Sequence, residues 1–176
     1  MDLPLPIGDD LRRAAPPGTR VLLALSGGVD SAVSLAVLRA LGCEVLAVTF
    51  KNFCHADQDA ADEKACCSLD AIADARDLAA RHGARHWVHD VSARFRQRVI
   101  DPFVQEYAAA RTPNPCLACN AGVRFPALVH LAEQQDCRLV ATGHYARVVR
   151  RTDGAAELHR GRDPQKDQSY FLGQVP

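Results

Sequence analysis

Residues 21–31 are Val21-Leu22-Leu23-Ala24-Leu25-Ser26-Gly27-Gly28-Val29-Asp30-Ser31. The apolar run predicts a buried strand, and the apolar spacing from Ser31 to Leu41 predicts a helix, so two glycines join a strand to a helix. Glycine takes backbone angles that other residues avoid and lets the chain approach an anion closely. The amides and the dipole of a helix N-terminus also favour negative charge. We therefore expect the amides of Gly27, Gly28 and Val29 to bind phosphate oxygens, with the hydroxyls of Ser26 and Ser31 as further donors.

The residues after the glycines exclude two common phosphate-binding loops. A Walker loop ends in Gly-Lys-Ser/Thr, but no lysine follows Gly28, and the glycine spacing does not match a dinucleotide fingerprint. A simpler interpretation is that Asp30 or Ser31 caps an ordinary helix after a glycine turn. Because it explains one residue and not the complete hexapeptide, we favour the phosphate loop.

Strands and helices alternate along the rest of the chain. We expect strands at 44–50, 85–91 and 138–142, and helices from Cys67 or Ser68 to His82, over 92–110 with a kink or break at Pro102, and over 122–134. This order predicts an α/β fold with a Rossmann-like parallel sheet and helices on both faces. Ligands of such sheets bind beyond the carboxyl ends of the strands, where Ser26–Ser31, Phe50–Phe53 and Thr142–Tyr145 would meet. A hairpin around Asp153-Gly154 and a short helix from Asp167 follow.

The composition favours one domain. The chain has 176 residues, a usual length for a single domain, and its net charge is zero. We expect an N-terminal extension at 1–20 and a nucleotide-binding domain at 21–176. The first 20 residues do not resemble a signal peptide and the apolar runs are too short to cross a membrane, so we expect a cytoplasmic protein with no membrane partner.

The charge is unevenly distributed along the chain. Residues 1–93 hold 9 Lys+Arg and 13 Asp+Glu (9 − 13 = −4), and the remainder 12 and 8 (12 − 8 = +4). The basic half either contacts a phosphate backbone or only solvates the surface.

Seven cysteines in a reducing compartment indicate thiol or metal chemistry, not a disulfide framework. Cys116 and Cys119 form a Cys-x-x-Cys pair in a proline-rich stretch, and Cys66-Cys67 lies upstream. Four thiolates would suit zinc, and three would suit an iron–sulfur cluster, for which Cys67, Cys116 and Cys119 are the candidates. The pair could also be a nucleophile with a lowered thiol pKa, or simply a reduced structural pair. We expect Cys43 and Cys137, which lead into strands, in the core.

Several ordered motifs resemble those of one known family. The loop Ser26–Ser31 resembles the pyrophosphatase loop of ATP-dependent enzymes that transfer AMP to an acceptor oxygen. The other matching motifs are Phe50-Lys51-Asn52, Cys67-Ser68 with Asp74-Ala75, Arg111–Asn120 with Phe125, Ala141–Arg147 and Lys166–Leu172. Together they resemble the tRNA-specific 2-thiouridylase family over most of the chain. The resemblance implies an adenine nucleotide alpha hydrolase fold.

The resemblance also implies an enzyme with ATP, Mg²⁺ and tRNA as its ligands. Such an enzyme adenylates the C2 oxygen of the wobble uridine, replaces it with sulfur from a persulfide donor protein, and releases AMP. Asp30 would lie near the pyrophosphate and its magnesium, and Phe50, Gly143 and His144 would border the adenosine. Cys119 would handle the sulfur, with Cys116 as a second catalytic residue. The residues expected to contact tRNA are Arg147, Lys166, Asp167, Gln168 and Tyr170.

Two departures from the family pattern affect these expectations. Many members carry aspartate where this chain has Cys116, so the extra soft ligand favours an iron–sulfur centre. The family continues into a central domain and a β-barrel that hold a partner cysteine, and these are absent from this sequence. We expect Cys66, Cys67 or a second chain to replace that cysteine, or the chain to be a fragment that does not complete the reaction cycle. Two alternatives stay open: a truncated ATP- and metal-binding accessory module, or an adenylating sulfur or amide transferase for a small molecule.

Overall fold

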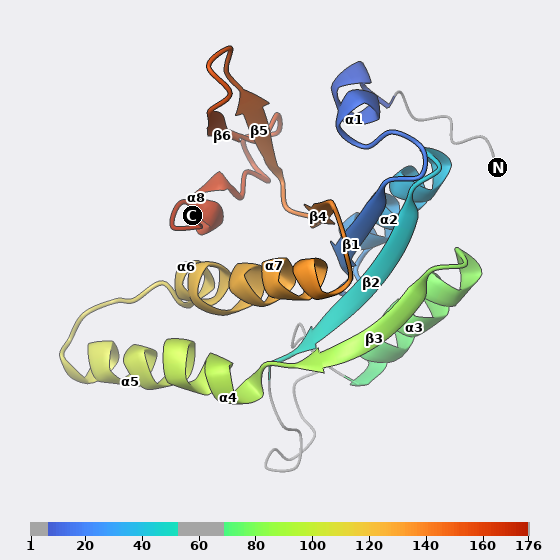
Figure 1. Cartoon of the computed structure of the whole chain (residues 1–176). Helices are drawn as coiled ribbons and strands as arrows, with labels where there is room; N and C mark the ends of the chain where they lie inside the picture. The colour runs from blue at the N-terminus through green and yellow to red at the C-terminus, as the bar shows by residue number, and fades with distance from the viewer. Residues whose placement is uncertain (1–6, 53–68, 176) are drawn as a thin grey trace. The chain divides into compact units, whose positions relative to one another are not determined.

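Figure 1 shows the computed structural model of the chain, which describes residues 7–52 and 69–175. The chain forms two compact units. The first takes its residues from Met1–Ser92 and Ala127–Gly143, and the second from Ala93–Pro126 and His144–Pro176. Both units therefore join segments that are distant in the sequence.

The first unit contains a four-stranded parallel sheet with the strand order β3-β2-β1-β4. Val21 on β1 pairs with Val45 on β2 and with Leu139 on β4. The strand order reverses between β1 and β4, and ligands of open α/β sheets bind at such a reversal. The strands are β1 (Arg20–Ala24), β2 (Glu44–Lys51), β3 (Arg85–Asp90) and β4 (Leu139–Ala141).

Helices cover both faces of this sheet, which confirms the predicted α/β fold. α2 (Val29–Ala40) and α3 (Leu69–Arg81) lie on one face, and α7 (Phe125–Gln134) crosses the other (Figure 1). Because alternate side chains of a strand point to opposite faces, Val21 and Leu23 share one face and Leu22 takes the other. All three are almost fully buried. The main core on the α2 and α3 face contains Ala15, Val21, Leu23, Leu25, Leu35, Leu38, Leu41, Cys43, Val45, Ala47, Ala75 and Ala79.

The segment before β1 packs onto this core. It contains the short helix α1 (Asp9–Ala14), followed by Ala15, whose side chain is buried. The amide of Gly18 donates to the carbonyl of Gly42 at 2.8 Å. Residues expected to form an extension are thus in contact with the sheet unit. Within the described residues, no helix combines the length and apolar character needed to span a membrane.

The second unit is built from helical segments and one hairpin. The strands β5 (Ala146–Arg150) and β6 (Ala156–Arg160) pair antiparallel. The turn between them contains Gly154 at a φ of +87°, which confirms the hairpin predicted there. The helical segments are α4 (Ser92–Phe95), the π-helical η2 (Arg96–Ile100), α5 (Asp101–Ala108), α6 (Pro115–Cys119), the π-helical η3 (Asn120–Arg124) and α8 (Ser169–Leu172).

A proline lies just after each π-helical stretch. Pro102 and Pro126 have no N–H, so the carbonyl four residues earlier loses its usual donor. The helix widens just before each proline, where an amide donates to the carbonyl five residues earlier and not four. The amide of Asp101 donates to the carbonyl of Arg96, and the amide of Phe125 donates to the carbonyl of Asn120. The irregularity predicted at Pro102 therefore lies in the residues that precede it.

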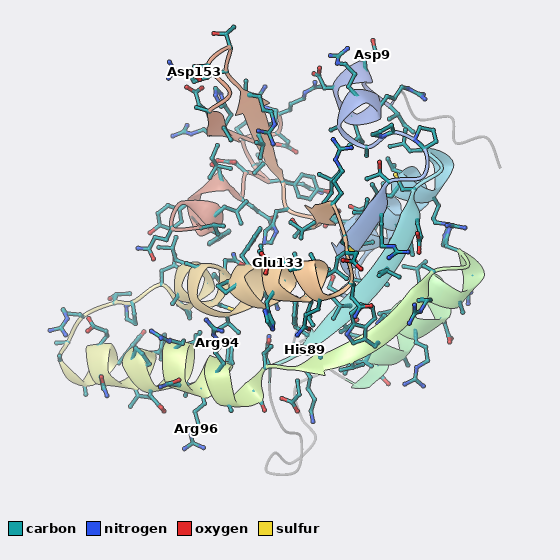
Figure 2. All side chains as sticks on the ribbon, viewed as in Figure 1. Asp9, His89, Arg94, Arg96, Glu133 and Asp153 are labelled. Atoms are coloured by element: carbon teal, nitrogen blue, oxygen red, sulfur yellow. The ribbon has the colours of Figure 1, made fainter. Side chains whose placement is uncertain are left out.

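Arg94 supplies the donor that Pro126 removes. Its Nε donates to the carbonyl of Gly122 at 2.9 Å. Figure 2 shows Arg94 and Arg96 on opposite sides of their helix, with Arg96 directed away from the other helical segments. A Cβ added to Gly122 would lie 3.6 Å from the Cβ of Arg98, so the two π-helical stretches pack closely at this glycine.

Candidate functional site

The glycine loop begins directly after β1 and ends at the start of α2. Gly28 is the N-cap residue of α2, and no side chain caps the helix. Asp30 and Ser31 lie inside the first turn, so the interpretation that one of them caps an ordinary helix is wrong. Gly28 and Asp30 are exposed, as expected for a loop whose backbone contacts a ligand.

Hydrogen bonds within the loop hold its shape. The buried Ser31 hydroxyl donates to the carbonyl of Gly28 at 2.9 Å and accepts from the amide of Ser26 at 3.2 Å. Because its proton is used, the hydroxyl of Ser26 is the donor in the 3.1 Å contact between the two serines. The amide of Gly28 in turn lies 3.4 Å from the Ser26 oxygen. Ser31 therefore shapes the loop here, and its role as a phosphate donor stays a prediction.

Two glycines allow neighbouring backbone to approach this loop. Gly27 has a φ of +79°, and a Cβ there would lie 2.5 Å from the carbonyl oxygen of Ala71 in α3. A Cβ on Gly143 would lie 3.0 Å from the amide nitrogen of Ser31. Since Gly143 follows β4, the structure brings the ends of β1 and β4 together, as the sequence predicted.

The end of β2 contributes an aromatic ring and an amide. Phe50 is buried, and its ring meets His89 edge-on at 6.1 Å between centroids. Asn52 is only 3% exposed, and its Oδ1 has no hydrogen-bond partner among residues 7–52 and 69–175. A buried acceptor without a donor is costly, so an N–H group of a ligand would fit here. The predicted contact at Phe53 lies outside the described residues.

His144 belongs to the second unit. Burial and the charge of Arg124 hold the pKa of His144 below its ordinary value. Its ring lies 6.0 Å from that of Phe125, with the planes tilted by 34°. The histidine is therefore neutral near pH 7, and its contact with a nucleotide stays a prediction.

The Cys-x-x-Cys pair lies on a helix, although the prolines around it would favour a loop. Asn114 caps α6 by accepting a hydrogen bond from the amide of Leu117 at 3.1 Å, and Pro115 starts the helix. Cys116 is exposed, whereas Cys119 is buried. Cys54, Cys66 and Cys67 lie outside the described residues. Within the described ranges no three potential metal ligands lie together, so a site that includes Cys67 stays a prediction.

The segment around α8 is held to the Cys-x-x-Cys helix inside the second unit. Asn120, which ends one of the sequence motifs but was given no role there, is buried and donates through Nδ2 to the carbonyl of Phe171 at 3.1 Å. In the sequence, a polar residue directly after Cys119 on an otherwise apolar helix face could have indicated such a buried hydrogen bond. The unit therefore brings Cys119 and the segment from Lys166 to Tyr170 into one substructure.

The residues expected to contact tRNA fall into two groups. Asp167 accepts hydrogen bonds from the amides of Gly161 and Ser169, which lower its pKa, and Gln168 Oε1 accepts from the amide of Tyr145 at 2.9 Å. These two side chains hold the hairpin and α8 together. The more exposed group comprises Arg147, Lys166 and Tyr170. The Nε of Arg147 donates to the carbonyl of Arg160, and the ammonium of Lys166 lies 5.5 Å from the centre of the Tyr145 ring. Tyr170 is 65% exposed.

Comparison with known proteins gives the family. Residues 19–176 match the tRNA methyl transferase HUP domain. The tRNA-specific 2-thiouridylase MnmA of Deinococcus radiodurans is 43% identical over 159 residues, covering 90% of this chain and 42% of that protein. The protein of the same name from Sphingopyxis alaskensis is 49% identical over 153 residues, covering 87% and 40%. The chain thus spans about two fifths of the length of these relatives.

Solved structures show the same fold. Glutamine-dependent NAD⁺ synthetase from Acinetobacter baumannii, solved in complex with adenosine diphosphate, matches 77% of this chain and 23% of its own, with a TM-score of 0.50 and 21% identity. The resemblance to the 2-thiouridylases is confirmed by the curated relatives. Because the family match extends from just before β1 to the last residue, the chain belongs to the tRNA methyl transferase HUP domain family.

Proposed function

We propose that the chain carries the ATP-dependent chemistry of a tRNA-uridine 2-sulfurtransferase. One observation carries the proposal: the glycine loop lies where the strand order reverses between β1 and β4, with Gly143 packed against it. The chain that holds this loop is similar to 2-thiouridylases. The family description names a methyl transferase. We favour sulfur transfer because one helix of the second unit carries two thiols, the exposed Cys116 and the buried Cys119.

Adenylation solves the chemical problem of replacing an oxygen of a pyrimidine. The C2 oxygen of the uridine attacks the α-phosphorus of ATP, a P–O bond forms, and pyrophosphate leaves. The terminal sulfur of a cysteine persulfide then attacks C2, the C2–O bond breaks, and AMP leaves with the oxygen. A second thiol attacks the sulfur of the carrier cysteine, the S–S bond breaks, a disulfide forms and 2-thiouridine is released. The reaction needs a site for pyrophosphate, a site for the nucleoside, a thiol that carries sulfur and a second thiol that releases it.

Named residues can meet each need. The amides of Gly27, Gly28 and Val29 would hold phosphate oxygens at the N-terminus of the twelve-residue helix α2. The exposed carboxylate of Asp30 is a hard oxygen ligand of the kind that Mg²⁺ prefers, and the ion would neutralise phosphate charge. Phe50, Gly143 and His144 would border the adenosine.

The sulfur chemistry would use Cys119, with Cys116 as its neighbour on the same helix. Since Cys119 is buried here, its thiol would have to become accessible before it accepts sulfur from a persulfide donor protein. Together with Cys67, the pair would offer three thiolates to an iron–sulfur cluster or zinc. A second chain could supply what the longer relatives carry in the rest of their length. Such a protein would act in the cytoplasm.

The tRNA would bind the more exposed side chains of the second unit. Arg147, Lys166 and Tyr170 provide two positive charges and an aromatic ring, which suit a phosphate backbone and an unstacked base. Asp167 and Gln168 would act indirectly, by holding the segment that presents Lys166 and Tyr170.

Two measurements separate adenylation, followed by pyrophosphate release, from sulfur transfer, followed by 2-thiouridine formation. With ATP, Mg²⁺ and unmodified tRNA, Asp30→Ala should reduce tRNA-dependent pyrophosphate release at least about tenfold, the loss expected for a residue that contacts the reacting phosphates. Asp9→Ala, which removes an exposed carboxylate of α1, is the matched control. Unchanged release by Asp30→Ala would contradict the loop assignment.

Cys119→Ala should retain pyrophosphate release but form no 2-thiouridine, measured by mass spectrometry of the tRNA after anaerobic incubation with a persulfide donor. If 2-thiouridine still forms, Cys119 does not carry the sulfur. An iron content of zero after anaerobic reconstitution would argue against the cluster.

A further inference from the structure

A chain of hydrogen bonds crosses three strands beneath the glycine loop. The hydroxyl of Thr49 on β2 lies 2.6 Å from the carbonyl oxygen of Leu25, the residue after β1. The same hydroxyl lies 2.8 Å from Nε2 of His86 on β3. Thr49 is only 3% exposed, so water does not compete for these bonds.

The chemistry of the three groups fixes where the protons lie. A carbonyl oxygen cannot donate, so the single hydroxyl proton of Thr49 must go to Leu25. The imidazole nitrogen beside Thr49 must then carry a proton of its own and donate it to the hydroxyl oxygen. Burial and the positive charge of Arg76 hold the pKa of His86 below its ordinary value, so the ring is neutral near pH 7. His86 is therefore the Nε2–H tautomer.

The bond to Leu25 restrains the first peptide group of the glycine loop from both sides. The carbonyl of the Leu25–Ser26 peptide accepts from Thr49, and the amide of the same peptide donates to Ser31 Oγ at 3.2 Å. One strand-like bond, from the amide of Leu25 to the carbonyl of Val48 at 2.9 Å, precedes it. The orientation of this peptide sets the direction in which the chain continues into Gly27 and Gly28.

We propose that His86 is a positioning residue of the phosphate loop: through Thr49 it orients the Leu25–Ser26 peptide and with it the loop amides. The inference rests on the proposed function, because the loop is taken to bind ATP. The hydrogen bond of His86 goes to Thr49, so its effect on the loop is indirect. Its N–H occupies the acceptor side of the Thr49 hydroxyl, which prevents that hydroxyl from turning away from Leu25.

Substitutions at both positions test the loop directly. His86→Leu removes the donor and Thr49→Val removes the hydroxyl. Each should weaken the binding of ATP with Mg²⁺, measured by titration calorimetry on the full chain, about fivefold, the equivalent of one hydrogen bond. The double variant should be no weaker than Thr49→Val alone, because both changes break one chain of bonds. His86→Gln, whose amide can donate from a similar position, should bind within about twofold of the unaltered chain.

The control is His130→Leu, the same replacement at an exposed histidine of α7, which should leave ATP affinity unchanged. Wild-type affinity in His86→Leu would overturn the proposal, as would an equal loss in His86→Gln and His86→Leu, since that pattern indicates packing alone.

Two measurements on the loop do not depend on ATP. In ¹⁵N spectra of the unaltered chain, the His86 ring should show a protonated Nε2 and an unprotonated Nδ1. The opposite tautomer, with the proton on Nδ1, would overturn the proposal. This measurement needs no variant, so it stands even if every variant misfolds. Hydrogen exchange of the Ser26 amide should become about fivefold faster in His86→Leu than in His130→Leu. If the unaltered chain binds no ATP but both results appear, the positioning role stands and the proposed function fails.

Discussion

Gly143 lies directly against Ser31 at the reversal of the strand order: a Cβ on Gly143 would come within 3.0 Å of the Ser31 amide nitrogen and 3.2 Å of the carbonyl carbon of Asp30. Both neighbours are backbone atoms in the first turn of α2, and backbone cannot rotate away as a side chain can. The absence of a side chain at residue 143 therefore helps to set the position of the loop.

Gly143→Ala should displace the start of α2 and weaken ATP binding about tenfold, with a loss of about 1–3 kcal/mol in the free energy of unfolding from overpacking. Titration calorimetry and urea unfolding measure the two effects. Gly8→Ala is the control, because a Cβ there would meet nothing within 4 Å. Equal ATP affinity in both variants would show that the loop tolerates the displacement.

The bond from Arg94 to the Gly122 carbonyl predicts a difference between two arginines on one helix. Arg94→Leu leaves that carbonyl without the donor that Pro126 cannot provide, so the free energy of unfolding should fall by about 1 kcal/mol. Arg96→Leu removes a 3.8 Å ion pair between two exposed groups, Arg96 and Asp101. It should change the free energy of unfolding by at most about 0.5 kcal/mol. Urea unfolding of both variants makes the comparison, and equal losses would contradict the assigned role of Arg94.

The sheet and its loop were predictable because their signals are local. The apolar run before Gly27 indicates β1, and glycine pairs mark turns wherever they occur. The position of Gly143 beside the loop followed from a general rule for parallel sheets, which needs the strand order and no contact between particular residues.

Other features depend on partners that are distant in sequence. Thr49 and His86 are ordinary strand residues until β2 and β3 pair. The start of α6 at Pro115 was obscured by its prolines, although Asn114 followed by Pro115 is a good helix start. The bonds from the Asp167 carboxylate to the amides of Gly161 and Ser169 also need the fold, whereas its contact with tRNA stays a prediction.

The two histidines with lowered pKa values predict how stability depends on pH. His86 and His144 each have a pKa below the ordinary 6.5, so the folded chain stays neutral at these sites where the unfolded chain already binds protons. Their contribution to stability is present above pH 6.5 and is lost as the pH falls towards the folded pKa values. The free energy of unfolding should therefore decrease over this range, and the decrease should be smaller in a chain with both His86→Gln and His144→Gln. Asp90 and Asp167, whose pKa values lie below 3.8, act only at lower pH. An unchanged slope in the double variant would contradict this origin.

Asn52 predicts a preference for the amino group of adenine. Its buried Oδ1 has no donor among the residues described, and it follows the strand that carries Phe50, which we expect beside the adenosine. If the 6-amino group of adenine donates to it, ATP should bind about tenfold more tightly than purine riboside triphosphate, which lacks that group. Asn52→Leu should lose this discrimination, because it removes the acceptor that the amino group would meet. Competition titrations with the two triphosphates measure the ratio. A ratio that persists in Asn52→Leu would show that another group reads the base.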